Sequence, residues 1–209
     1  MITKEKLAIF LSKLKKVENP KYWLEQYSLS SELAAEILWL AHLSKDIKNK
    51  IILDLGCGNG ILAIGAKKLG AKYCIGLDID KESIKTALEN SKKFKKIFYV
   101  LGDVEKFYLK RNVDTVIQNP PFGLKSKRHE DIKFLKKAFS LAKKVYSLHR
   151  NGYKRTFNFI KSFAEKNGFS LVNSFKIKLE LFKTFSFHRS YKKVVDVRLY
   201  CFSSTKNLF

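Results

Sequence analysis

Two short segments, far apart in the sequence, carry the residue types that could do chemistry. The first is the glycine-rich run Asp54-Leu55-Gly56-Cys57-Gly58-Asn59-Gly60, and the second is Asn119-Pro120-Pro121-Phe122-Gly123. Each of them closes an apolar stretch. Glycines at this spacing let the backbone turn sharply and approach a ligand closely, as in loops that bind a nucleoside-containing cofactor.

The proline pair in the second segment predicts a rigid turn with fixed acceptors. Each proline forces the residue before it into an extended backbone, so the Asn119 side chain and the Pro120 carbonyl should be held in place. These two oxygens can accept the two hydrogens of an exocyclic amino group and stabilise the positive charge that grows during attack. Phe122 can stack on the ring that carries the amine. We therefore predict Asn119, Pro120, Pro121 and Phe122 as catalytic residues of methyl transfer to an amino nitrogen of a planar base, without a metal; the alternative is a rigid loop after a core strand.

Acidic residues follow three predicted strands and favour S-adenosylmethionine as the methyl donor. Asp78 can accept hydrogen bonds from ribose hydroxyls, and Asp103 can accept from the adenine amino group beside the Val104 backbone amide. A glycine turn could equally bind NAD, but the spacing is GxGxG rather than GxGxxG, and hydride transfer has no use for the proline-rich turn. The predicted cofactor-binding residues are Asp54, Gly56, Gly58, Asn59, Gly60, Ile61, Asp78, Asp103, Val104 and Asn119.

The elements that must position these residues alternate along the chain. Strands alternating with helices predict a parallel sheet covered on both faces, and a final hairpin predicts an antiparallel edge. This is the class I (Rossmann-like) methyltransferase architecture with seven strands. We expect an N-terminal helical extension or lid over residues 1–45, ahead of a methyltransferase domain over 46–209. Helices are expected over 4–16, 30–44, 61–69, 81–92, 131–143 and 153–167, and strands over 50–55, 73–77, 97–101, 113–118, 144–148, 169–181 and 194–202.

The composition of this chain of 209 residues indicates which kinds of partner it can bind. Its net charge of +23 favours binding to a polyanion such as nucleic acid, although a lysine-rich proteome would also give a basic protein. The apolar stretches are too short to span a bilayer and the N-terminus does not resemble a signal peptide, so we expect a cytoplasmic protein. Cys57, Cys74 and Cys201 are odd in number and widely spaced, which predicts buried, redox-silent thiols rather than disulfides or a zinc site.

Over nearly its whole length the chain resembles the archaeal and eukaryotic methyltransferase-like enzymes that make N6-methyladenosine in small-subunit rRNA. The motifs that carry the resemblance are Leu24-Glu25-Gln26-Tyr27, Asp54-Leu55-Gly56-Cys57-Gly58, Gly76-Leu77-Asp78-Ile79-Asp80, Asp114-Thr115-Val116-Ile117 before the proline-rich turn, Val145-Tyr146-Ser147-Leu148-His149, Phe187-His188-Arg189 and Val195-Asp196-Val197.

The resemblance implies site residues that spacing alone does not give. It implies that Gln26 closes over the cofactor together with Tyr27 and Leu29, and that Ile79 joins the cofactor site. It also implies that a flipped adenine enters between Asn119 and Phe122, and that a small zinc-binding activator protein pairs with an exposed sheet edge by strand addition. The chain departs from the family at Leu29, where the family usually has threonine; Ser28 or Ser30 are the candidates to supply the missing hydroxyl.

Basic residues near the two ends of the predicted site are the candidates for RNA contacts. The loop after the proline-rich turn and the tip of the final hairpin carry them, the latter interleaved with phenylalanines. Other substrates stay open, namely a protein glutamine or DNA adenine acceptor, as does an RNA-binding ribosome-assembly role. The candidate RNA-binding residues are Lys125, Lys127, Arg128, His188, Arg189, Lys192 and Lys193.

Overall fold

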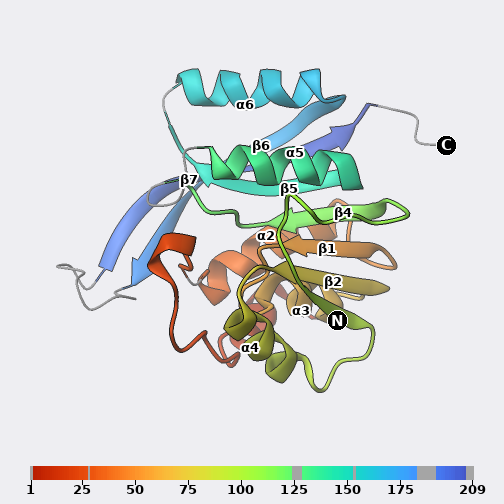
Figure 1. The fold of residues 1–209 in the computed structure, drawn as a ribbon, viewed down its shortest axis with the longest axis vertical. Coiled ribbons are helices and arrows are strands. Elements are labelled where there is room, and N and C mark those ends of the chain that lie inside the picture. The colour runs from red at the N-terminus through yellow and green to blue at the C-terminus, as the bar shows by residue number, and fades with distance from the viewer. Residues whose placement is uncertain (1, 28, 124–128, 153, 183–191, 206–209) are drawn as a thin grey trace.

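A computed structural model describes residues 2–27, 29–123, 129–152, 154–182 and 192–205. These ranges hold one seven-stranded sheet in the order β3-β2-β1-β4-β5-β7-β6 (Figure 1). Strands β1 to β5 run parallel, while β7 pairs antiparallel with both β5 and β6. The strands are β1 (Ile51–Leu55), β2 (Tyr73–Asp78), β3 (Ile97–Leu101), β4 (Val113–Gln118), β5 (Ala142–Arg150), β6 (Phe169–Phe182) and β7 (Lys192–Ser204).

Helices cover both faces of this sheet. Side chains of α1, α2 and α3 share one core cluster with β1 and β2, while those of α5 and α6 share a second cluster on the opposite face. Adjacent strand residues alternate between the two, as Ile52 and Leu53 do in β1. The helices are α1 (Lys4–Leu11), the short 3₁₀ turn η1 (Tyr22–Leu24), α2 (Ser31–Leu43), α3 (Ile61–Lys68), α4 (Lys81–Ser91), α5 (Glu130–Leu141) and α6 (Lys154–Lys166).

Local chemistry explains where several helices begin. Ser30 caps α2 by accepting the Leu33 backbone N–H at 3.2 Å, and Asp80 caps α4 by accepting from Ser83 at 3.1 Å. Gly60 takes the cap position of α3 at a φ of +83°, a left-handed conformation that suits glycine. A side chain there would also collide with the Tyr99 hydroxyl, since an added Cβ would lie 2.5 Å from it.

The predicted class I methyltransferase architecture is confirmed, including the antiparallel hairpin at one edge. The strand predictions for 97–101 and 113–118 match β3 and β4 in full. The first helix is shorter than predicted, because α1 ends at Leu11 rather than near residue 16. All three cysteines are free and buried, as expected. No helix in the described ranges is long and apolar enough to cross a membrane.

Candidate active site

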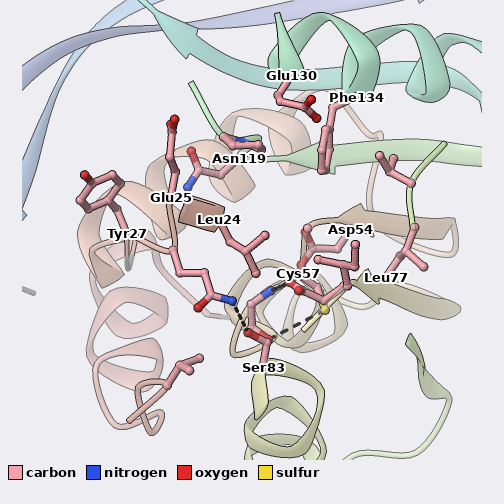
Figure 2. A pocket seen from close by; sticks show the side chains of 18 of the residues that line it. Leu24, Glu25, Tyr27, Asp54, Cys57, Leu77, Ser83, Asn119, Glu130 and Phe134 are labelled. Atoms are coloured by element: carbon pink, nitrogen blue, oxygen red, sulfur yellow. Dashed lines mark hydrogen bonds between the residues drawn. The ribbon is translucent and has the colours of Figure 1, made fainter. Parts of the chain in front are cut away.

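A cavity of about 600 Å³ opens where the parallel strands end. Ligands of open α/β sheets bind at this carboxyl edge, beside the switch in strand order, which here lies between β1 and β4. Its walls come from the segment after η1, the ends of β1, β2 and β4, and the first turns of α5 (Figure 2). Predicted residues in its lining are Gln26, Tyr27, Leu29, Asp54, Gly56, Gly58, Asn59, Ile61, Asp78, Ile79, Asp103, Val104, Asn119 and Pro121.

The floor of the cavity is the glycine turn, held to β2 by Asp78. The Asp78 carboxylate accepts the backbone N–H of Gly58 at 2.8 Å and that of Asp80 at 2.9 Å. Gly58 has a φ of +53°, and an added Cβ there would meet nothing within 4 Å. The turn therefore presents bare backbone to an open space, which suits a ligand that lies close against it. Each Asp78 oxygen keeps lone pairs for further donors, such as ribose hydroxyls.

Asp54 is almost wholly buried beside this turn, with its side chain at the cavity wall. One of its oxygens accepts the Ala63 backbone N–H at 3.1 Å, and the other has no partner among the described residues. Burial raises the pKa of Asp54 to about 8, the Ala63 hydrogen bond lowers it, and the nearby Asp78 raises it further. Burial likewise raises the pKa of Asp78. A bound cation would favour the ionised form of both groups.

Asn119 brings the proline-rich turn to the cavity. It follows β4 directly, and its side-chain oxygen is buried without a hydrogen-bond partner in the described part of the chain. Leaving a buried carbonyl oxygen unpaired costs free energy, of the order of 1–3 kcal/mol. A donor delivered into the cavity would satisfy it. An exocyclic amino group is such a donor.

The segment after η1 forms the outer wall, and two contacts tie it down. Glu25, with a left-handed φ of +50° and a buried side chain, accepts the Phe122 backbone N–H at 2.7 Å. Gln26 donates to Asp80 at 3.1 Å and to Ser83 at 3.2 Å, both at the start of α4. Residues 22–27 therefore connect the proline-rich turn, which we call the acceptor turn, with the start of α4 across the cavity. From here on the name lid refers to these residues alone, which are one part of the predicted extension over residues 1–45.

Asp80 anchors the lid as an ionised carboxylate. Burial alone would raise its pKa, but the hydrogen bonds from Lys21, Gln26 and Ser83 outweigh burial and hold the pKa of Asp80 below its ordinary value. Lys21 forms an ion pair with the same carboxylate, which is fully buried at its side chain. This anchor was not predicted, since Asp80 was named only as the last residue of the motif Gly76-Leu77-Asp78-Ile79-Asp80.

A buried polar chain supports the acceptor turn from behind. Gln118, next to Asn119, donates to the Ser147 hydroxyl at 2.8 Å, and that hydroxyl lies 2.8 Å from Nε2 of His149. The other ring nitrogen of His149 lies 3.0 Å from Asp131 in the first turn of α5. His149 is fully buried and does not line the cavity. Its place indicates a structural role behind the proline-rich turn.

The structure leaves some predicted site residues out of the cavity wall. Pro120 and Phe122 do not line it, and Phe122 packs against the core cluster of α1 to α3. Gly60 is also outside the lining, and its need for glycine comes from Tyr99. Ser30 is engaged as the α2 cap, while Ser28 lies outside the described residues.

The predicted RNA-binding residues fall largely outside the described ranges. Lys125, Lys127, Arg128, His188 and Arg189 lie there. Lys192 and Lys193 begin β7 at the backbone level, paired with Phe182 and Leu181 of β6. Their role stays a prediction.

Several wall residues were not predicted. Glu25 was named only as part of a motif. Glu130, Lys133 and Phe134 of α5 also line the cavity, and Figure 2 shows Glu130 and Phe134 among its walls. Phe134 lies against Gly56, where an added Cβ would be 3.2 Å from its ring. The helical period of 131–143 predicted the helix but gave no sign of which residues of its first turns face a ligand.

The cavity fits S-adenosylmethionine in its polar groups. Two buried acidic side chains, Asp54 and Asp78, and a bare backbone turn line it on one side, and Asn119, whose buried side-chain oxygen is unpaired among the described residues, lines it on the other. Carboxylates suit the cationic methionine and sulfonium centres and the ribose hydroxyls of that cofactor. Among the described residues, no group of three or more His, Cys, Asp or Glu side chains could hold a metal ion.

Comparison with known proteins gives close relatives over the full chain. The rRNA N6-adenosine-methyltransferase METTL5 of Danio rerio is 36% identical over 197 residues, covering 87% of this chain and 88% of its own. An uncharacterised protein of Methanocaldococcus jannaschii is 39% identical, covering 99% and 95% of the two chains. The solved structure of a candidate RNA methyltransferase from Pyrococcus horikoshii superposes with a TM-score of 0.91 at 42% identity, covering 99% of this chain and 100% of that one.

A family model for ribosomal protein L11 methyltransferase (PrmA) also matches, over residues 34–120 only. That range runs from α2 to the first residues of the proline-rich turn and holds most of the cofactor side of the cavity. The likeness to PrmA therefore concerns the half of the site that we predict to bind the methyl donor, and it leaves out α5 and the rest of the acceptor side.

Proposed function

The chain belongs to the METTL5 family of rRNA N6-adenosine methyltransferases, and on this premise we propose that it methylates N6 of an adenosine in small-subunit rRNA. It is an S-adenosylmethionine-dependent RNA methyltransferase with the class I fold of that family. The resemblance at the lid, the acceptor turn and the β5 motif supports the small subunit as the source of the substrate.

The observation that carries the proposal is the unpaired, buried oxygen of Asn119. The amino group of adenine is a weak nucleophile, because its lone pair is delocalised into the ring. A hydrogen bond from the amino group to Asn119 draws the nitrogen toward tetrahedral geometry and stabilises the positive charge that develops on it. S-adenosylmethionine, when bound, supplies an electrophilic methyl group.

The remaining residues orient and enclose the reactants. Asp78 fixes the glycine turn, and we propose that Asp78 and Asp103 also hold the ribose and adenine of the cofactor. Glu25 and Gln26 join the lid to both sides of the cavity, so that a closed lid excludes water and sets the two reactants in line. No strong general base is required, since the proton can leave to water after transfer.

The test is transfer of labelled methyl from S-adenosylmethionine to purified small-subunit and large-subunit rRNA, followed by nucleoside analysis. Label in N6-methyladenosine of small-subunit rRNA is expected. Label in large-subunit rRNA alone would overturn the substrate, and label in a ribosomal protein would favour the glutamine acceptor instead. Binding to rRNA with no label in any fraction would favour the assembly-factor role.

We also propose that a small zinc-binding activator protein adds a strand at β3. This strand is an edge of the sheet, paired with β2 alone. Phe98 and Leu101 are more than half exposed there, and Val100 is 38% exposed. An edge strand with unpaired backbone groups and exposed apolar side chains is prone to pair with other chains and to aggregate. A partner that adds a strand here would pair the backbone groups and cover the apolar side chains. The other edge strand, β6, instead carries exposed polar residues at alternate positions, such as Lys176 and Lys178.

A further inference from the structure

A second pocket, of about 320 Å³, lies apart from the cofactor cavity. It is lined by the segment that joins β5 to α6 and by facing residues of α6, β6 and β7. None of its lining residues belongs to the predicted site or to the predicted RNA contacts. They are Asn151, Gly152, Lys154, Phe157, Lys176 and Arg198.

Three of these six residues are cations, and no carboxylate neutralises them among the described residues. Lys154, Lys176 and Arg198 form no ion pair there, although eight ion pairs involve other residues. Asp196 is the acidic residue nearest along β7, and its backbone carbonyl is what accepts the Asn151 N–H at 2.8 Å. Like charges gathered around one hollow repel one another unless an anion occupies it.

Arg198 is fixed in place by neutral contacts. Its guanidinium donates to the Ser174 hydroxyl at 2.9 Å and to the Asn151 side chain at 3.3 Å, and it lies 5.1 Å from the centre of the Phe157 ring. Both acceptors are uncharged, so the positive charge remains available while the side chain is held. A guanidinium held in this way loses little freedom on binding and matches the geometry of a phosphate.

The register of the sheet places this pocket on the acceptor side of the molecule. β5 runs parallel to β4, with Gln118 opposite Ser147, so Asn119 comes level with Leu148. Asn151 follows Leu148 by three residues in the same direction. At about 3.3 Å per strand residue, the pocket begins some 10 Å beyond Asn119 and one strand across. The nucleotides that flank a base inserted at Asn119 therefore pass within reach of it.

We propose that this pocket binds a backbone phosphate of the RNA strand beside the target adenosine. The inference rests on the proposed function, since it assumes an RNA acceptor at Asn119. Lys154 and Lys176 supply point charges and Arg198 supplies paired donors, which together position the strand without reading its sequence. A single-stranded acceptor is favoured because a base must leave its stack to reach Asn119.

The experiment measures RNA affinity against salt for the double variant Lys154→Gln/Lys176→Gln. The probe is a single-stranded RNA of about 16 nucleotides with one central adenosine, enough to fill a site of ordinary size. The matched control is Lys110→Gln/Lys166→Gln, which removes the same charge at exposed positions near the amino ends of the strands. Cofactor binding by calorimetry and the melting temperature report the fold of each variant.

The quantity compared is the slope of the logarithm of the RNA binding constant against the logarithm of the salt concentration, which we call the salt slope. Lys154→Gln/Lys176→Gln should make this slope shallower by about 0.7 for each phosphate contact removed, and the control pair should leave it unchanged. A second series replaces single phosphates beside the adenosine with neutral methylphosphonates. One such replacement should weaken binding to the wild type and to the control pair but not to the pocket variant, and Arg198→Lys should give an intermediate response.

Equal slopes for the pocket and control variants, or equal sensitivity of both to every methylphosphonate, would overturn the phosphate site while the wild type still methylates the probe. Failure of the wild type to bind or methylate any RNA would instead overturn the proposed function. The two failures are thus distinguishable in one set of measurements.

Discussion

We propose that the carboxamide of Asn119 contacts the reacting nitrogen, so its removal should act on the chemical step. We expect Asn119→Ala to lower kcat by about 100- to 1,000-fold, as for other lost transition-state hydrogen bonds, with cofactor affinity nearly unchanged. Single-turnover methyl transfer and calorimetry measure the two quantities. Asn112→Ala, at an exposed position just before β4, is the control. A variant that no longer binds cofactor would show that Asn119 belongs to the cofactor side.

Asp54 gives the site a dependence on pH that acts through stability. Its pKa in the fold, about 8, is higher than the ordinary value of 3.8. Between these two pH values the folded protein therefore keeps a proton on Asp54 that the unfolded chain releases. The stabilisation is full below the unfolded pKa and is lost as pH rises through the folded one. The wild type should therefore lose melting temperature between about pH 4 and pH 8 relative to Asp54→Asn, which has no carboxyl to ionise.

Thermal melts of the two proteins across that range provide the measurement for Asp54, and their difference cancels the other titrating groups. Parallel curves would mean that Asp54 is ionised in the fold. Added S-adenosylmethionine should shrink the difference, because its cationic groups favour the carboxylate.

The lid acts as one element because its two contacts lie on consecutive residues. Glu25 holds the acceptor turn and Gln26 holds the start of α4. We expect Glu25→Ala to free Phe122 and misplace Asn119, with kcat about 10- to 100-fold lower, since small misplacements at a reacting centre are costly.

Glu25→Gln keeps an acceptor oxygen for the Phe122 N–H and should recover most of the activity. Comparing kcat and KM for the cofactor in the two variants separates positioning from binding. If Glu25→Gln lowers kcat as much as Glu25→Ala does, the negative charge of Glu25 is what matters, and not its hydrogen bond to Phe122.

Elements were predictable where local patterns and tertiary packing agree. The apolar runs that became β3 and β4 are bounded by glycine, proline and acidic residues, and their limits followed from the sequence. The length of α1 did not, because residues 13–16 continue the helical period yet leave the helix at Ser12; Lys15 instead contacts Asn90 and Glu89 of α4.

The candidate site divides in the same way. The glycine turn and Asn119 carry their chemistry in residue type and spacing, so sequence placed them at one edge of the sheet. The hydrogen bond of Glu25 to Phe122 joins residues far apart in the sequence, and the cations of the second pocket come from three different elements. No periodicity connects such residues. The register of β6 and β7 places Lys176 opposite Arg198, and only the packing of the folded chain brings the others to their partners.

At the scale of the whole molecule, the two edges of the sheet differ in a way that suits different partners. The basic pocket faces the hairpin side, where Lys176 of β6 and Arg198 of β7 lie opposite each other. The apolar edge is β3, at the other end of the strand order (Figure 1). A protein partner at β3 would thus leave the RNA side open.

The β3 edge predicts a specific effect of Phe98→Asp on assembly. A charge on the exposed apolar face should weaken association with the zinc-binding activator about tenfold or more, since buried aromatic side chains dominate such contacts. Val172→Asp is the control, because Val172 is 65% exposed on the opposite edge strand β6. Titration calorimetry with the purified activator measures both.

Methyl transfer should fall with Phe98→Asp only when the activator is present, since β3 lies outside the reacting residues. Weakening by Val172→Asp instead would move the partner to β6, where it would compete with RNA at the basic pocket. Competition between RNA and the activator is therefore an independent test of where the activator binds. If the activator binds at β3, RNA and activator should bind at the same time, and the dependence of RNA affinity on salt should be the same with and without the activator.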